Sequence, residues 1–133
     1  TQVFAVEPEH AAALGPSLLR GEVVELARPQ SLAGSLCVKR IAPALLTACR
    51  EHPVTALTVT DAEASQACVR LAEDHGLLVE PACGTALAPL FADHPALAGV
   101  ERLVAVVCGG MVVTLDQLAD WSHAGEVPMC ATA

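Results

Sequence analysis

The hydrophobic positions of this chain form short apolar runs separated by stretches with helical spacing. Three runs are typical of strands: residues 3–6, 56–59 and 100–107. Five stretches predict helices: residues 10–19, 41–51, 61–75, 84–91 and 115–121. Strands that alternate with helices indicate an α/β fold, a parallel sheet flanked by helices. We expect one domain over residues 1–122, followed by a loosely ordered tail over residues 123–133.

The predicted helix 61–75 carries signals at both of its ends. Thr60 or Asp61 is placed to cap its first turn, and Glu63 completes a capping-box pattern. Gly76 follows the last turn, where a left-handed residue ends a helix.

Two stretches combine an apolar run with small residues and glycine. Residues 104–110 read VAVVCGG, and residues 77–84 read LLVEPACG. A buried strand that opens into glycines brings backbone close to a ligand. The two stretches together predict a cofactor pocket at the carboxyl ends of a parallel sheet. Taken alone, Cys108 is more typical of a buried thiol at the end of a strand, and the flanking glycines and the second motif favour the cofactor pocket instead.

The composition restricts the possible partners. Hydrophobic residues make up 53% of the chain but aromatic residues only 2%, which is typical of a core of Val, Leu, Ala and Ile. The net charge of −8, with seven Lys plus Arg, argues against nucleic acid as a partner. No apolar run approaches the roughly 20 residues of a membrane span, and the chain starts without a signal-peptide pattern. We expect a cytoplasmic protein with no membrane partner.

The cysteines are too widely spaced for a zinc site, and no CxxC pair occurs. We expect most of them, Cys108 excepted, to be small buried thiols. The six positions are Cys37, Cys49, Cys68, Cys83, Cys108 and Cys130.

The chain resembles the C-terminal part of L-serine dehydratase, in the pyridoxal phosphate (PLP) family that includes threonine deaminase and serine racemase. The resemblance rests on VEP at residues 6–8, GEVV at 21–24, LLVEPACGTALA at 77–88, VCGG at 107–110 and LDQL at 115–118. It implies part of the large domain of a fold-type-II PLP enzyme that acts on a small amino acid. It also implies a homodimer.

The resemblance assigns the VCGG residues to the cofactor. Cys108, where relatives usually carry Ser, would hydrogen-bond the pyridine nitrogen, and Gly109 and Gly110 would let backbone lie close to the ring. A thiol holds a protonated pyridine less well than a carboxylate does, which suits β-elimination. Ser35 would present its backbone carbonyl to the cofactor. Glu80 either supports the wall of the site or caps the next helix, and Cys83 serves in packing.

The resemblance also implies a cation site. The Glu7 carboxylate and the backbone carbonyls of three further residues would bind potassium or a divalent cation, since hard cations prefer oxygen ligands. The carbonyls belong to Ala11, Leu36 and Val38. Ala13 stands where relatives often carry a further ligand. The alternative is that Glu7 is a solvated carboxylate at the end of a strand.

The chain carries no catalytic residue of its own under this interpretation. The Schiff-base lysine and the phosphate-binding glycine loop precede this region in the family, and Lys39 matches no such motif. We predict a serine or threonine dehydratase that is active only with an N-terminal segment and inactive as this chain alone. The chain would then be one product of a split or nicked enzyme, an incomplete piece, or an inactive relic. The alternatives are an α/β binding or interaction module and a serine racemase-like enzyme.

Overall fold

The computed structural model describes residues 1–123 of the chain. Its sheet consists of two parallel strands, β1 (Val3–Pro8) and β2 (Val54–Val59). The register pairs Ala5 with Ala56 and Val6 with Leu57. The parallel sheet and the flanking helices confirm the predicted α/β class.

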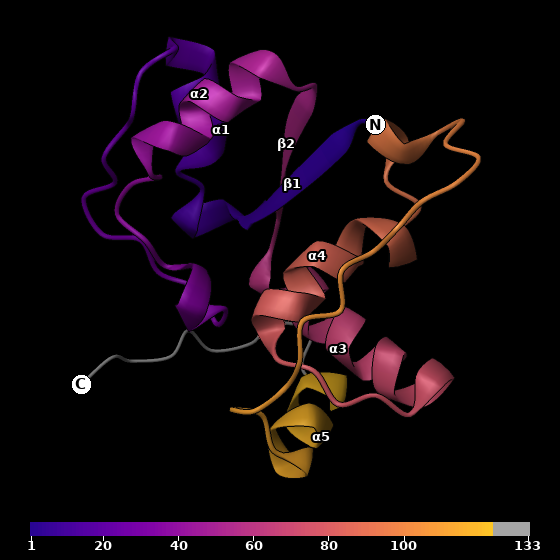
Figure 1. Cartoon of the computed structure of the whole chain (residues 1–133). Coiled ribbons are helices and arrows are strands. Elements are labelled where there is room, and N and C mark those ends of the chain that lie inside the picture. The colour runs from indigo at the N-terminus through magenta and orange to yellow at the C-terminus, as the bar shows by residue number, and fades with distance from the viewer. Residues whose placement is uncertain (124–133) are drawn as a thin grey trace.

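The helices with their bounds are α1 (Leu14–Arg20), α2 (Pro43–Glu51), α3 (Asp61–His75), α4 (Pro81–Phe91) and α5 (Leu115–His123). Helices α1 and α2 lie on one side of this strand pair, and α3, α4 and α5 lie on the other (Figure 1). Three short 3-10 turns complete the described elements: η1 (Glu9–Ala11), η2 (Gly34–Leu36) and η3 (Pro95–Leu97). No helix within residues 1–123 has the length and hydropathy needed to cross a membrane.

The predicted signals at the ends of α3 are confirmed. The Thr60 hydroxyl accepts a hydrogen bond from the Glu63 N–H, and the Glu63 carboxylate accepts one from the Thr60 N–H. This reciprocal pair satisfies two backbone donors that a helix otherwise leaves free. Gly76 ends the helix in the left-handed conformation, with φ of 66°.

The core forms two clusters because successive strand residues point to opposite faces of the sheet. Ala5 and Ala56 share a face with a cluster built on α1 and α2, around Leu14, Ile41 and Leu46. On the other face, Val59 and Val6 join a larger cluster from α3, α4 and α5. This larger cluster includes Cys68, Cys83 and Trp121.

The predicted strand 100–107 is wrong. The segment runs beside the sheet without joining it, and β1 and β2 are the two strands within residues 1–123. Val104, expected in a buried strand, is 92% exposed, and Val106 is 70% exposed. An apolar run forms a strand only when a neighbouring strand accepts its backbone hydrogen bonds, and none of the described segments lies there to do so.

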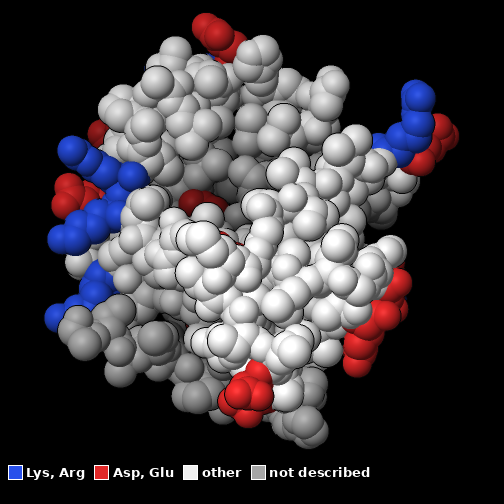
Figure 2. Space-filling model, turned by 60° about the horizontal axis from the view of Figure 1, so that its bottom comes forward, with Lys and Arg blue, Asp and Glu red and all other residues white. Residues whose placement is uncertain are grey.

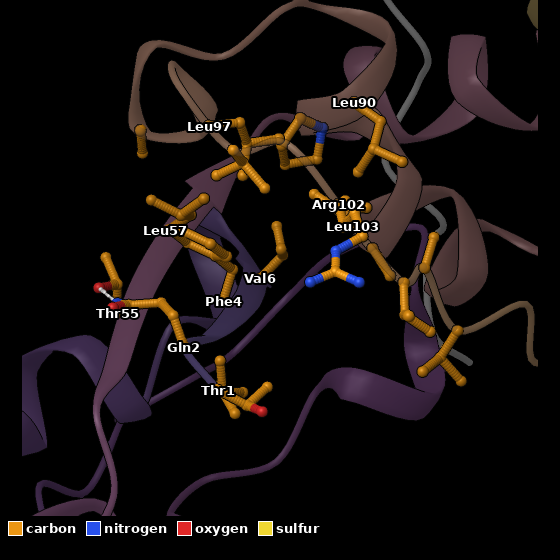
Figure 3. A pocket seen from close by; sticks show the side chains of 18 residues that line it. Thr1, Gln2, Phe4, Val6, Thr55, Leu57, Leu90, Leu97, Arg102 and Leu103 are labelled. Atoms are coloured by element: carbon orange, nitrogen blue, oxygen red, sulfur yellow. Dashed lines mark hydrogen bonds between the residues drawn. The ribbon is translucent and has the colours of Figure 1, made fainter.

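A hollow of about 890 Å³ separates this segment from the sheet. Phe4, Val6 and Leu57 lie on its sheet side, and Arg102 and Leu103 lie across from them (Figure 3). On the face of the molecule seen in Figure 2, the Lys and Arg side chains lie toward the rim, and some Asp or Glu atoms are visible at the bottom of a hollow near the centre. One face of the sheet is therefore covered by helices, while the opposite face is only partly covered.

The predicted tail lies almost entirely outside the described residues. Helix α5 runs to His123, one residue into that tail, and residues 124–133, including Cys130, are not among those described. The expectation of buried cysteines is confirmed for Cys68 and Cys83, whereas Cys37 and Cys49 are half-buried.

Candidate functional site

The two glycine-containing motifs of the sequence meet in the structure. The Glu80 N–H donates a hydrogen bond of 2.9 Å to the Gly109 carbonyl oxygen, and the Cys108 N–H donates one of 3.3 Å to Cys83 Sγ. Residues 108–110 are thus attached to the first turn of α4 and to the residue before it. The Cys108 side chain itself is exposed at this junction.

The two glycines of this loop have different roles. A Cβ on Gly110 would lie 2.4 Å from the Leu78 carbonyl oxygen and 2.8 Å from Val79 Cα, so this glycine permits close packing of two backbone segments. Gly109 has φ of 136°, a conformation that favours glycine, and no atom lies within 4 Å of the position of a Cβ. The space for a ligand is therefore beside Gly109, and Gly110 faces the protein.

Cys68, Cys83 and Cys108 lie at this junction, and the pKa is raised for two of these thiols, Cys68 and Cys108. Burial raises the pKa of Cys68 to about 12, and the neighbouring Cys83 adds to the rise. Desolvation raises the pKa of Cys108, with a further rise from Cys83 through its charge and a hydrogen bond between the two side chains. A protonated thiol at Cys108 can donate a hydrogen bond as well as accept one.

Glu80 does not cap α4, so that part of the expectation is wrong. It stands at the N-cap position, but its side chain makes no hydrogen bond to the first turn of the helix. Its carboxylate instead accepts a bond of 3.5 Å from the hydroxyl of Ser35. This contact places the predicted cofactor residue Ser35 close to the Cys108 loop, although the two are far apart in the sequence.

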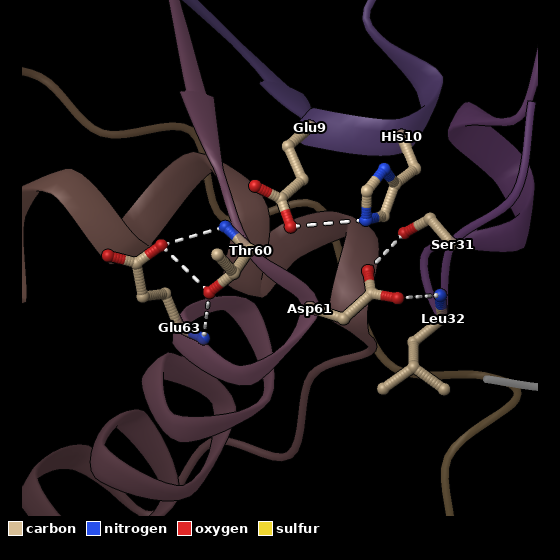
Figure 4. A network of polar contacts seen from close by, with 7 residues as sticks. All are labelled: Glu9, His10, Ser31, Leu32, Thr60, Asp61 and Glu63. Carbon is tan, nitrogen blue, oxygen red and sulfur yellow. Dashed lines mark hydrogen bonds and ion pairs between the residues drawn. The ribbon is translucent and has the colours of Figure 1, made fainter. Parts of the chain in front are cut away.

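The loop that carries Ser35 is held by Asp61, the first residue of α3 (Figure 4). The Asp61 carboxylate accepts hydrogen bonds from the Ser31 hydroxyl and, at 3.0 Å, from the Leu32 N–H. The Ser31 hydroxyl also accepts the Ala33 N–H. The sequence pattern around Asp61 indicates only a helix cap, because no local pattern links residues that lie thirty positions apart.

The Glu7 carboxylate binds the start of α1. Its Oε1 accepts the N–H groups of Ala13 at 2.9 Å and Leu14 at 2.7 Å, and its Oε2 accepts the N–H of Gly15 at 3.0 Å. Neither the cation-site interpretation nor the solvated-carboxylate interpretation predicts this contact. The Glu7 carboxylate is hydrogen-bonded to backbone and is not freely solvated. A carboxylate offers about four acceptor positions, so these three bonds leave roughly one for a cation.

The other predicted cation ligands lie in η1 and just around η2. Ala11 ends η1, Leu36 ends η2, and Val38 follows two residues later. The Leu36 carbonyl already accepts the Val38 N–H at 2.8 Å. Residues 1–123 contain no group of three His, Cys, Asp or Glu side chains placed to hold a metal, so a cation here would depend on backbone carbonyls.

Comparison with known proteins identifies the class. Residues 1–109 match the family model described as pyridoxal-phosphate dependent enzyme. The chain therefore belongs to the family of pyridoxal-phosphate-dependent enzymes, and PLP is the cofactor of that family. The predicted fold family and cofactor are confirmed by this match.

The relatives that the chain matches include an L-serine dehydratase/L-threonine deaminase and an L-serine ammonia-lyase. The chain is 35% identical to human L-serine dehydratase/L-threonine deaminase over 87% of its own length and 38% of the relative's. It matches the crystal structure of a fungal L-serine ammonia-lyase from Rhizomucor miehei with a TM-score of 0.84 and 31% identity, over 92% of this chain and 40% of that one. These matches confirm the resemblance drawn from the motifs. The chain spans about 40% of the length of these proteins.

A serine racemase from Dictyostelium discoideum has the same fold. Its structure matches with a TM-score of 0.73 over 85% of this chain and 36% of that one, at 24% identity. This likeness concerns the fold alone and does not distinguish a racemase from a dehydratase.

Proposed function

We propose that this chain forms one wall of the active site of a PLP-dependent L-serine and L-threonine dehydratase. Such an enzyme removes the β-hydroxyl of L-serine and yields pyruvate and ammonia. The observation that carries the proposal is the exposed Cys108 thiol, on a loop fixed to α4 by backbone hydrogen bonds. The similarity to L-serine dehydratase/L-threonine deaminase supports this reaction.

The surroundings of Cys108 fit the pyridine ring of the cofactor. The thiol is exposed, and the open side of Gly109 leaves room beside it for a flat ring. Because the pKa of Cys108 is raised, the thiol remains neutral and can donate a hydrogen bond to the pyridine nitrogen. When bound, PLP supplies an electron sink for β-elimination, and a neutral partner at the ring nitrogen keeps this sink moderate.

Other parts of the active site would come from an N-terminal segment of the same enzyme. The chain has a single lysine, Lys39. It is exposed and lies in a loop, where its backbone carbonyl accepts the Leu26 N–H. Because its surroundings match no Schiff-base motif, Lys39 is not our candidate for the lysine that holds the cofactor. The matched relatives are more than twice as long as this chain, which gives room for such a segment.

The partly covered face of the sheet also supports the proposal that an N-terminal segment binds this chain. Phe4, Val6 and Leu57 line the hollow there, and the segment beside it exposes Val104 and Val106. A large exposed apolar surface is typical of a face that another polypeptide covers. The run 100–107 also has strand-forming composition without a neighbouring strand. A strand from the N-terminal segment would supply those hydrogen bonds and fill the hollow.

Co-expression of this chain with an N-terminal counterpart tests the proposal. The counterpart is the N-terminal part of the human relative, or of the Rhizomucor miehei enzyme if that pair assembles better. We expect the two polypeptides to co-purify, to show the visible absorbance of bound PLP, and to release pyruvate from L-serine. This chain alone, treated with PLP, should release none. A stable complex that binds PLP and releases no pyruvate would refute the dehydratase, and racemisation of serine by it would favour the racemase.

We further propose that Glu7 contributes one oxygen to a cation held mainly by the carbonyls of Ala11, Leu36 and Val38. The remaining acceptor position of the Glu7 carboxylate supports this role. The three backbone bonds of Glu7 would then serve a second purpose, because they fix the carboxylate next to the turn that contains Ala11.

Replacing Glu7 with glutamine should lower the free energy of unfolding by roughly 1.5–3 kcal/mol, because charge-assisted hydrogen bonds to the start of α1 are lost. The matched control is Glu9→Gln, two residues further on. The exposed Glu9 carboxylate lies 3.3 Å from Nε2 of the exposed His10, and such a surface contact contributes little, so the change should stay within about 0.5 kcal/mol. Urea unfolding measures both effects.

The same proteins test the cation. Potassium, compared with choline at equal ionic strength, should stabilise the wild type and Glu9→Gln, since a ligand that binds only the folded state stabilises it. It should not stabilise Glu7→Gln. Equal stabilisation of all three proteins would place the cation elsewhere.

A further inference from the structure

We propose that Cys83 and Cys108 form a reversible disulfide. This modification site lies at the proposed cofactor-binding loop and would remove the Cys108 thiol from contact with the cofactor. The two residues lie 25 positions apart, yet Cys83 Sγ accepts the backbone N–H of Cys108 at 3.3 Å. The Cys108 thiol itself donates to the Val106 carbonyl oxygen at 3.8 Å, and it is close enough to Cys83 for that thiol to raise the pKa of Cys108. Two thiols in contact, one exposed and one buried, form an arrangement in which an oxidant reaches one sulfur and the other then completes the bond.

The backbone keeps the pair together. The Glu80 N–H bonds the Gly109 carbonyl at 2.9 Å on one side of Cys108, and Gly110 packs against the backbone of Leu78 and Val79. Cys83 lies in the first turn of α4 and is fully buried. A disulfide requires its two Cβ atoms to come within about 4.5 Å, and the neighbouring Gly109 gives the loop the freedom for that small adjustment.

The reaction is thiol–disulfide exchange with a small disulfide such as oxidised glutathione. The Cys108 thiol loses its proton, attacks one sulfur of the small disulfide, and releases one small thiol. The Cys83 thiol then loses its proton, attacks Cys108 Sγ, and releases the second small thiol. Two protein thiols are oxidised to one disulfide, and one small disulfide is reduced to two thiols.

The third thiol nearby, Cys68, is not accessible to an oxidant. Cys68 lies in α3, is fully buried, and would lie 2.6 Å from a Cβ on Gly84. Nothing exposes it to an oxidant, so it cannot begin the exchange. It is the natural competitor of Cys108 for Cys83, and its replacement is a matched control.

The consequence for activity rests on the proposed function. A sulfur bonded to Cys83 has no proton to donate, so Cys108 can no longer hydrogen-bond the pyridine nitrogen. Oxidation should therefore lower dehydratase activity, and bound PLP should slow oxidation because it covers Cys108. Reduction should restore both the thiols and the activity.

Peptide mapping of the chain tests the disulfide independently of activity. The chain is incubated with oxidised glutathione, alkylated and digested with trypsin, which separates residues 71–102, with Cys83, from residues 103–133, with Cys108 and Cys130. We expect these two peptides to be linked through Cys108. The link should persist in Cys68→Ser and Cys130→Ser and disappear in Cys108→Ser. A Cys68–Cys83 link, or glutathione retained on Cys108 with Cys83 free, would overturn the proposal.

The assembled enzyme tests the consequence. The activity of the wild type should fall on oxidation and return on reduction. The activity of Cys83→Ser, measured before and after the same oxidation, should not change. A disulfide that forms without loss of activity would overturn the regulatory role. If no complex is active before oxidation, the proposed function fails, while the peptide map still decides whether the disulfide forms.

Discussion

Replacing Gly84 with alanine is expected to destabilise the chain by about 3 kcal/mol or more. A Cβ at this position would lie 2.0 Å from the Ala64 carbonyl oxygen and 2.6 Å from Cys68 Sγ. The first of these atoms belongs to the backbone of α3, so the two helices would have to separate. Because α3 and α4 form the larger core cluster, that separation exposes apolar surface, and urea unfolding should report the loss.

The matched control for this substitution is Gly34→Ala. Gly34 is exposed, lies in η2, and has no atom within 4 Å of the position of a Cβ. Its replacement should change the free energy of unfolding by no more than about 0.5 kcal/mol. Equal effects of the two substitutions would mean that α3 and α4 do not pack as closely as the structure has them.

Replacing Cys108 with alanine should lower kcat of the assembled enzyme about tenfold, the equivalent of one hydrogen bond of roughly 1.4 kcal/mol. Cys108→Ser should stay within about threefold of the wild type, because a hydroxyl also donates and accepts. Both variants should fold normally, since the Cys108 side chain is exposed. Steady-state release of pyruvate from L-serine measures the effect.

The matched control is Cys49→Ala, at a half-buried cysteine in α2. It belongs to the other core cluster and should leave kcat unchanged. If Cys108→Ala retains the activity of the wild type, the thiol has no part in the reaction and the assignment of this loop to the cofactor fails.

Local signals were sufficient to predict much of the fold. Helix α3 has its capping box and its terminal glycine in the local sequence, and the structure confirms both of them. Strand β1 was likewise predicted from its apolar run. The run 100–107 has an equally clear apolar pattern but forms no strand, because a strand depends on hydrogen bonds from a neighbour. That requirement cannot be read from the segment alone.

The contact between the two glycine-containing motifs was predicted, but its structural cause was not. The sequence predicted that VCGG and the EPACG segment would meet at strand ends, and they do meet. The reason that they meet is different, because neither segment is a strand. They are joined by the packing of Gly110 on Leu78 and by the hydrogen bond from the Cys108 N–H to Cys83 Sγ. The capping of α1 by Glu7 and the anchoring of Ser31 by Asp61 connect residues without a shared local pattern. Such contacts became visible only in three dimensions.

The central claim is that Cys108 lies against the pyridine nitrogen of PLP, and a structure of the assembled enzyme with bound cofactor tests it most directly. We predict that Cys108 Sγ lies within hydrogen-bonding distance of that nitrogen, at about 3.5 Å. We also predict that the ring edge passes on the open side of Gly109. A pyridine nitrogen that contacts a different residue, with Cys108 turned away from the ring, would contradict the account.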